Sequence, residues 1–153
     1  ENEKVEAIAL AAIQAPSAMN KQPWQIIVIK DKALIEEMDA FGMTQLDEAS
    51  HQRIMSRGGK LFYNAPLMVV VAKSANKDLD CGIVTQNITL AASSLGLGNV
   101  VCALAAFAFK NESFKDRIIP EGYEFGISVL IGYPSDETGT PHPVDHEKIT
   151  YIG

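Results

Sequence analysis

The sequence predicts an α+β domain, and three observations support this fold class. First, apolar and largely β-branched runs at residues 25–30, 67–72 and 124–132 are typical of buried strands. Second, helical patterns lie between these runs, but their spacing is too irregular for a doubly wound series of βαβ units. Third, a length of 153 residues suits one domain, which we expect to span residues 1–153.

Apolar spacing and capping residues predict three helices in the first part of the chain. The first helix covers residues 3–14. Asp31 can cap a second helix, which we expect Gly42 to end in the left-handed conformation. Thr44 with Asp47 gives a weaker capping signal for a third helix.

The second part of the chain is expected to contain two more helices and a tail. Asp80 can cap a long helix that is apolar over much of its circumference, belongs near the centre of the fold and stops at Gly96. An apolar stretch covers residues 100–109, and Asn111 then starts a short helix. The tail, residues 133–153, should be extended and lie over a surface or another subunit.

Composition and charge exclude several classes of protein. Apolar residues make up 47% and charged residues 21% of the chain, which is typical of a packed, water-soluble protein. The formal net charge of −6 gives no overall electrostatic reason to bind nucleic acid or an anionic membrane. No signal-peptide pattern and no apolar run of membrane-spanning length is found, so we expect a cytoplasmic protein.

The two cysteines, Cys81 and Cys102, form no CxxC pair and predict neither a zinc site nor a disulfide framework. Two reduced thiols fit a reducing compartment. Cys81 lies near a helix N-terminus, so it is either a reactive thiol of lowered pKa or a small buried residue. The second interpretation is favoured.

The loop of residues 16–23 is the most informative segment for function. Two prolines stiffen it directly before a buried strand, and polar loops at strand ends make good ligand sites. Ser17, Asn20 and Gln22 carry groups that both donate and accept hydrogen bonds, which suits a heterocycle edged with carbonyl and N–H groups, such as a flavin. The alternative is a turn whose side chains satisfy their own backbone, with Trp24 as a core anchor.

This loop resembles the flavin-contacting loop of the nitroreductase family, in the pattern Pro16-Ser17-x-x-Asn20-x-Gln22-Pro23-Trp24. Three further segments are similar to the family and follow in its order. They are Asn64-Ala65-Pro66, the long helix from Asp80 that ends in Leu-Gly-Leu-Gly98, and Gly132-Tyr133-Pro134. The resemblance implies a nitroreductase-like fold, in which helices flank a mostly antiparallel central sheet. It also implies an intertwined homodimer with two FMN pockets at the subunit interface.

The resemblance also implies which residues contact the FMN. In the loop these are Ser17, Met19, Asn20 and Gln22. A second segment, consisting of Val101, Cys102, Ala103 and Leu104, would lie along the flavin beside its reactive N5 atom. These four residues have no acid or strong hydrogen-bonding side chain, so their role should rest on backbone N–H groups.

In the nitroreductase family, residues near both ends of the chain bind the FMN phosphate. The family has an N-terminal Arg-Arg-Ser-x-Arg type motif, and nothing like it precedes the first predicted helix. Without those arginines a phosphate loses charge-assisted hydrogen bonds, so either the motif lies upstream of Glu1, as we expect, or FMN binds weakly.

The family also uses a basic residue of the C-terminal tail for the phosphate. The candidates here are His142, His146 and Lys148, of which Lys148 alone is reliably charged at neutral pH. A solvated surface lysine is the alternative interpretation of Lys148. A metal site that combines the two histidines with Asp145 is disfavoured, and we predict no metal.

The activity implied is an NAD(P)H-driven, ping-pong reduction of nitroaromatics, quinones or similar electron-poor acceptors, with the chemistry carried by FMN. Aromatic neighbours of the acceptor pocket would be Trp24 and either Phe107 or Phe109, although Trp24 also suits the core. The alternative is a flavin-binding or interaction protein of the same fold with little or no turnover.

Overall fold

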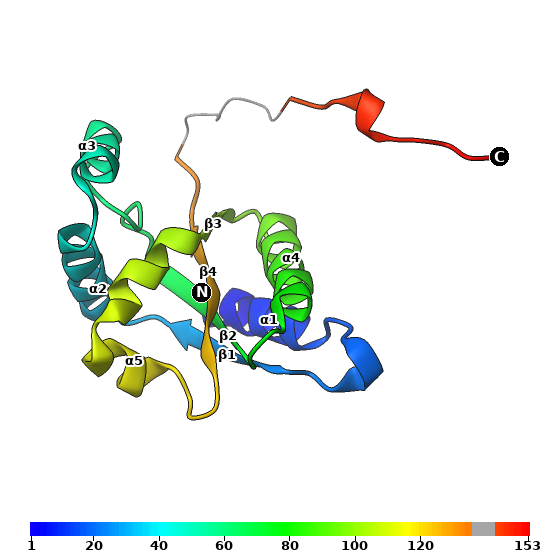
Figure 1. Cartoon of the computed structure of the whole chain (residues 1–153), viewed down its shortest axis with the longest axis horizontal. Helices are drawn as coiled ribbons and strands as arrows, with labels where there is room; N and C mark the ends of the chain where they lie inside the picture. The colour runs from blue at the N-terminus through cyan, green and yellow to red at the C-terminus, as the bar shows by residue number, and fades with distance from the viewer. Residues whose placement is uncertain (136–142) are drawn as a thin grey trace.

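A four-stranded antiparallel sheet lies at the centre of the computed structural model, which describes residues 1–135 and 143–153 (Figure 1). The strand order is β1-β2-β4-β3, and each neighbouring pair is antiparallel. The strands are β1 (Trp24–Ile29), β2 (Leu67–Lys73), β3 (Gly98–Cys102) and β4 (Glu124–Gly132). The α+β fold class is therefore confirmed.

Helices cover both faces of the sheet, and β2 is therefore buried at every one of its positions. Met68, Val70 and Ala72 belong to the core cluster on one face, which also contains side chains of α2 (Lys32–Thr44), η2 (Ala103–Lys110) and α5 (Glu112–Ile118). The alternate residues of β2, Val69 and Val71, belong to the cluster on the other face, with α1 (Asn2–Ile13) and α4 (Asp78–Ser94). A strand apolar on both faces explains why this run shows no alternation.

The predicted helix starts are mostly confirmed. Asp31 Oδ1 accepts the backbone N–H of Leu34 at 3.2 Å and caps α2, and Asp47 caps α3 (Glu48–Ser56) in the same way. The long helix α4 starts at Asp78, so Asp80 lies in its first turn instead of capping it.

The expectation that Gly42 ends α2 is wrong. The helix continues to Thr44, and Gly42 is buried inside it. A Cβ atom at this position would lie only 2.7 Å from Cδ1 of Leu61, so the glycine permits close packing of the loop before β2 instead of a turn.

The strand β3 is the element that the sequence did not predict. Residues 100–109 split between this strand and the 3₁₀ helix η2. Among the described residues β3 pairs with β4 alone, as an edge strand, and its Val100 and Val101 are 39% and 48% exposed. It therefore lacks the uniform burial that made the other strands readable as apolar runs.

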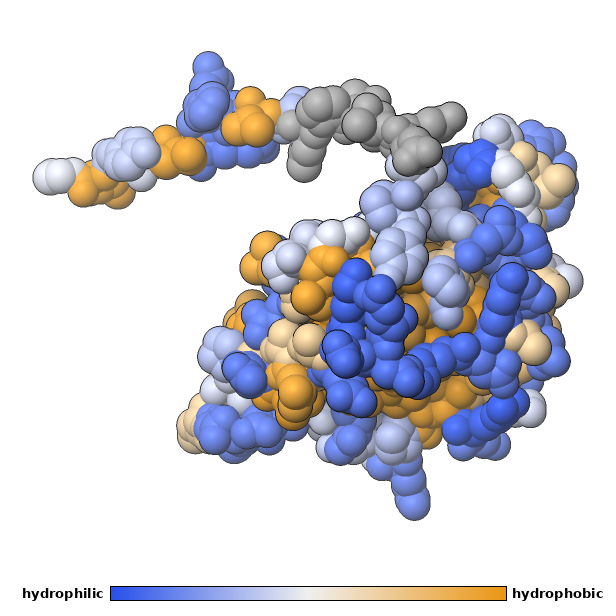
Figure 2. Space-filling model, turned by 180° about the vertical axis from the view of Figure 1, so that it is seen from behind, coloured by the Kyte–Doolittle hydropathy of each residue, from blue (hydrophilic) through white to orange (hydrophobic). Residues whose placement is uncertain are grey.

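The C-terminal residues 143–153 project from the body of the molecule (Figure 1). All of them are exposed, including the short 3₁₀ helix η3 (His146–Lys148). Apolar residues are visible on this projecting segment (Figure 2), and Val144 and Ile152 are 76% and 93% exposed. Packing of the tail on a partner subunit stays a prediction. Among the described residues, no helix is long and apolar enough to cross a membrane.

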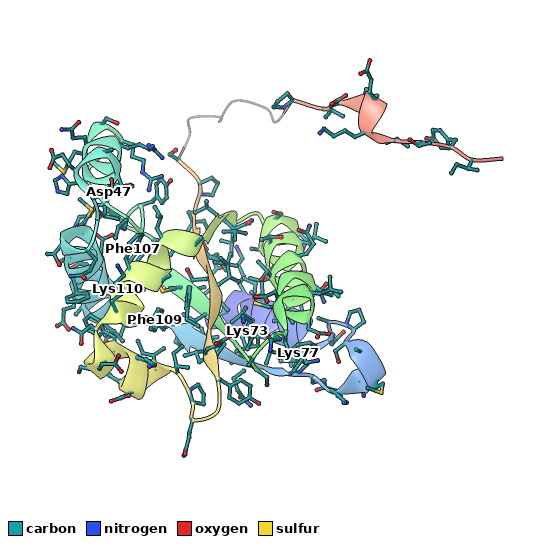
Figure 3. The ribbon with its side chains drawn as sticks, viewed as in Figure 1. Asp47, Lys73, Lys77, Phe107, Phe109 and Lys110 are labelled. Carbon is teal, nitrogen blue, oxygen red and sulfur yellow. The ribbon has the colours of Figure 1, made fainter. Side chains whose placement is uncertain are left out.

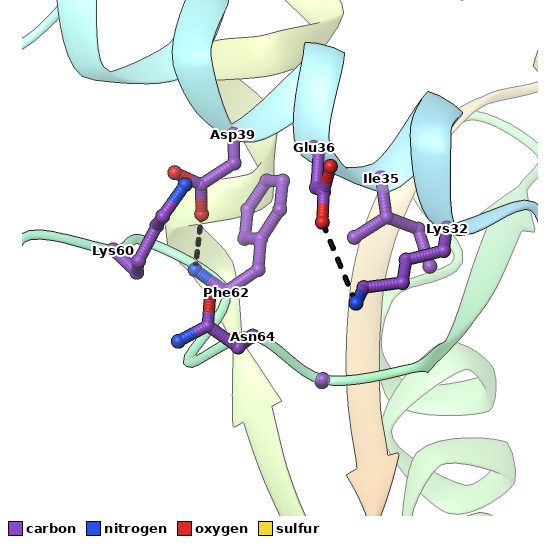
Figure 4. A pocket seen from close by; sticks show the side chains of 8 residues that line it. Lys32, Ile35, Glu36, Asp39, Lys60, Phe62 and Asn64 are labelled. Atoms are coloured by element: carbon purple, nitrogen blue, oxygen red, sulfur yellow. Dashed lines mark hydrogen bonds and ion pairs between the residues drawn. The ribbon is translucent and has the colours of Figure 1, made fainter.

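Asp39 fastens the segment that leads into β2. It is 4% exposed, and its carboxylate accepts the backbone N–H of Phe62 at 2.7 Å (Figure 4). Burial raises the pKa of Asp39, against smaller lowering effects from the N–H groups of Phe62 and Leu61 and from the charge of Lys60. The adjoining cavity, about 10 Å³, holds at most a water molecule, so we assign it no ligand.

The raised pKa of Asp39 has a measurable effect on stability. The folded chain binds this proton more tightly than the unfolded chain does. Its contribution to stability is therefore greatest at low pH and is lost as the pH rises from the ordinary value of 3.8 through the raised pKa. The free energy of unfolding of the wild type, relative to Asp39→Asn, should fall over that range by about 1.4 kcal/mol for each unit of pKa difference. Denaturant unfolding across pH measures it, and a difference that is constant or grows with pH contradicts it.

Both cysteines are core residues, each 5% exposed. Burial raises the pKa of the Cys81 thiol, and the charge of Lys73 lowers it by less. The interpretation of Cys81 as a reactive thiol of lowered pKa is therefore wrong, and the small buried residue is confirmed. Burial likewise raises the pKa of Cys102.

We expect both thiols to react slowly with a thiol reagent at neutral pH. Labelling of the native protein should be at least on the order of 100-fold slower than labelling in denaturant, because it requires local opening of the core. Ser113→Cys, at an exposed position of α5, is a control that should label at once. Labelling of Cys81 at the rate of this control would contradict the prediction.

Candidate functional site

The loop of residues 16–23 is held in a strained, polar conformation. It contains a short 3₁₀ turn, η1 (Ala18–Asn20), and three non-glycine residues with positive φ: Met19 at 53°, Asn20 at 53° and Gln22 at 46°. Left-handed backbone at non-glycine residues is uncommon and collects at functional sites.

Hydrogen bonds within the loop orient its polar side chains. Ser17 Oγ accepts the backbone N–H of Gln22 at 2.9 Å, and Gln22 Nε2 donates to Asn20 Oδ1 at 3.0 Å. Among the described residues, these bonds leave the Ser17 hydroxyl hydrogen, the Asn20 side-chain NH₂ group and the Gln22 side-chain oxygen Oε1 free to bond a ligand. This donor and acceptor set fits the edge of a neutral heterocycle such as a flavin. Met19, at the tip, is 81% exposed.

The loop is tied to the body at two points. Asp80 Oδ1 accepts the backbone N–H of Ala18 at 3.3 Å, and the carbonyl oxygen of Pro23 accepts the N–H of Ser74 at 3.0 Å. Trp24, which follows, is 5% exposed and belongs to the core on the α1 and α4 face. Trp24 is therefore a core anchor and not a wall of an open pocket.

The second predicted segment, residues 101–104, turns from β3 into η2. Val101 and Ala103 are exposed, Leu104 is half-buried, and Cys102 belongs to the core on the η2 face. The carbonyl of Cys102 accepts the hydroxyl of Ser128 at 2.9 Å in the buried interior, which fixes the turn. A ligand can thus reach the surface at Val101 and Ala103, whereas the side chain of Cys102 points into the core.

The two predicted segments do not meet within one chain. The loop precedes β1, and residues 101–104 cover the end of β3 and the start of η2. β1 and β3 are the two outer strands of the sheet. Three inter-strand spacings of about 4.8 Å separate them by about 14 Å across the sheet alone. Figure 1 shows η1 and η2 on opposite sides of the molecule.

Arg57 and Tyr63 lie near the second segment and were missed by the sequence analysis. The Arg57 guanidinium lies 4.4 Å from the centre of the Tyr63 ring, and its Nη1 donates to the Tyr63 hydroxyl. Tyr63 lines the same surface pocket as Gly98, Asn99 and Val100, which places the Arg57–Tyr63 pair beside β3. Tyr63 and Asn64 both have positive φ, 53° and 55°. The Asn64-Ala65-Pro66 pattern marked this region, but no sequence signal linked Arg57 to it.

The two phenylalanines predicted to lie beside the acceptor pocket, Phe107 and Phe109, differ in burial. Phe109 is buried and stacks on Phe125 with ring centres 4.8 Å apart, so it belongs to the core. Phe107 is half-buried, and the Lys110 ammonium lies 4.6 Å from its ring centre. Figure 3 shows Phe107 and Phe109 together with Lys110 on η2.

The predicted tail residues are exposed and apart from both segments. His146 and Lys148 lie in η3, where the side chain of Asp145 accepts the N–H of Glu147 at 3.1 Å. His142 lies outside the described residues. In residues 1–135 and 143–153, no group of three or more histidine, cysteine, aspartate or glutamate side chains is placed to hold a metal ion.

Comparisons with known proteins agree with the resemblance seen in the sequence. The nitroreductase family model matches residues 1–119. A protein of Archaeoglobus fulgidus, described as an NADH dehydrogenase/NAD(P)H nitroreductase, is 34% identical over 139 residues, which cover 89% of this chain and 75% of that protein.

Two solved structures are similar over nearly the whole chain. A nitroreductase of Desulfitobacterium hafniense, crystallised with bound FMN, is 47% identical with a TM-score of 0.93, and the match covers 100% of this chain and 88% of that one. An FMN-dependent nitroreductase of Clostridium difficile is 26% identical with a TM-score of 0.83, over 99% and 89% of the two chains. The chain belongs to the nitroreductase family.

Proposed function

We propose that this protein is an FMN-dependent oxidoreductase that uses NAD(P)H to reduce nitroaromatics, quinones or similar electron-poor acceptors by a ping-pong mechanism. The observation that carries the proposal is the loop of residues 16–23. In a chain that is 47% identical to a nitroreductase crystallised with FMN, this loop presents free donors and acceptors on a strained backbone. The two free, buried cysteines of the chain, Cys81 and Cys102, support a reducing compartment such as the cytoplasm.

The loop residues Ser17, Met19, Asn20 and Gln22 would bind the FMN ring and ribityl chain, and residues 101–104 would lie along the ring. FMN supplies hydride and electron transfer when it is bound. The side chains of the second segment carry no acid or base, so the protein's contribution there is to orient the ring and exclude water. Arg57 and Tyr63 would add a fixed positive charge and a hydroxyl beside the same segment.

His146 and Lys148 would serve the FMN phosphate from the C-terminal tail. Their exposure, and the projection of residues 143–153 from the body, support a role on a partner subunit instead of on their own domain. A cationic side chain there suits a dianionic phosphate. The chain's net charge of −6 makes such a local positive group necessary.

We propose that the active form is a homodimer. The two predicted contact segments lie at opposite edges of one sheet, so a single pocket that uses both needs two chains. The outer surface of α1 and α4 supports this. No charged residue occurs from Ala7 to Pro16 or from Cys81 to Ser94, yet Leu10 and Leu90 are 55% and 59% exposed. A water-facing helix surface normally carries charge, so an uncharged one is suited to burial.

Reconstitution with FMN tests the function. The purified full-length protein should bind FMN, and it should then oxidise NADH or NADPH with menadione or a nitrofuran well above the rate of free FMN. Flavin absorbance and steady-state NAD(P)H oxidation measure both. Protein that stays colourless in FMN contradicts the proposal. Bound FMN without turnover would favour the alternative, a flavin-binding protein of this fold.

A charge placed on the α4 surface tests the dimer. The wild type should have twice the 16.6 kDa mass of one chain in light scattering, whereas Leu90→Glu should shift toward the single-chain mass and lose FMN. The reason is that a carboxylate buried without a partner costs about 3–5 kcal/mol. Ser113→Glu, which adds the same charge on α5 across the sheet, should remain dimeric. Equal behaviour of the two variants would contradict this interface.

A further inference from the structure

We propose that Asp80 is a positioning residue, which holds the loop of residues 16–23 in the conformation that binds the flavin. The inference rests on the proposed function, since the loop is the FMN-contacting element there. Asp80 itself does not belong to the loop and lies 62 positions away from Ala18, whose N–H it accepts at 3.3 Å.

Packing does not hold this loop. From Pro16 to Gln22 every residue is exposed except Ser17, which is half-buried, and the apolar Met19 is 81% exposed. Three of these residues have positive φ, a conformation that persists only where the surroundings fix it. The fixing contacts are therefore hydrogen bonds. Among the described residues, the hydrogen bond from the Ala18 N–H to Asp80 is the one side-chain hydrogen bond that joins the loop to another element.

The position of Asp80 suits this role. It is 8% exposed, although the charged residue two positions earlier, Asp78, is open to solvent. Its negative charge lies in the first turn of α4, where the helix dipole favours it. The same carboxylate then accepts a backbone N–H from outside the helix.

Asp78 provides a matched control. It carries the same charge in the same helical turn, but its carboxylate pairs with Lys73 at 3.3 Å and, among the described residues, accepts no hydrogen bond from the loop. A general loss of charge at the start of α4 would affect Asp78→Ala and Asp80→Ala alike. Only the second change removes the acceptor of the Ala18 N–H.

Two measurements test the role. The first is trypsin cleavage after the exposed Lys21, made on protein without FMN, and the second is the dissociation constant of FMN. In Asp80→Ala we expect cleavage about tenfold faster and FMN binding about tenfold weaker, which is about 1.4 kcal/mol. Asp80→Leu, which cannot accept a hydrogen bond but favours the helix, should behave in the same way.

The conservative variant separates positioning from general stability. Asp80→Asn keeps a carbonyl oxygen that can accept the Ala18 N–H, so it should stay within about twofold of the wild type in both measurements, as should Asp78→Ala. If the wild type binds FMN and Asp80→Ala and Asp80→Leu bind it as tightly, the positioning role is wrong while the proposed function stands. If the wild type binds no FMN, the proposed function fails and the positioning role with it.

Discussion

Full burial of β2 on both faces is the constraint on which the rest of the structure depends. A strand buried at every position must lie inside the sheet and be covered by helices on each side. β2 pairs with β1 on one side and with β4 on the other, and β3 pairs with the far side of β4. β1 and β3 are therefore the two edges of the sheet. The two contact segments are separated because the core places them at opposite edges.

Hydrogen bonds to buried carboxylates hold two surface segments, the one before β2 and the loop before β1. Asp39 accepts a backbone N–H from the segment before β2, and Asp80 does the same for the loop before β1. In each case a carboxylate on a helix fixes a segment that contains left-handed residues, Tyr63 and Asn64 in the first and Met19 and Asn20 in the second. The strained segments are thus fastened from helices on opposite faces of the sheet.

The sequence predicts those parts of the fold whose signals are local. Three of the four strands and the starts of α2, α3 and α5 follow from apolar runs and capping residues. β3 was missed because an edge strand with two exposed valines looks no different from a loop. Gly42 was misjudged because a glycine before a polar stretch resembles a helix end, and its contact with Leu61 depends on a segment almost twenty residues away.

In the candidate site, too, the sequence reveals the residues whose signal is local and misses those that depend on tertiary contacts. The loop residues could be found because their spacing is a motif, and the strain in their backbone agrees with it. The sequence could not reveal Arg57, because its significance arises only when the end of α3 and the Tyr63 turn come together beside β3. The bond between Asp80 and Ala18 was also out of reach, since Asp80 already had a local explanation as a helix cap.

The uncharged outer surface of α1 and α4 has a consequence for handling the protein. In a two-chain assembly, burial of this surface and completion of each pocket are one equilibrium, so both obey mass action. Dilution alone would then release flavin and expose Leu10 and Leu90 together. Added FMN, in turn, would hold the chains together at concentrations where they otherwise separate.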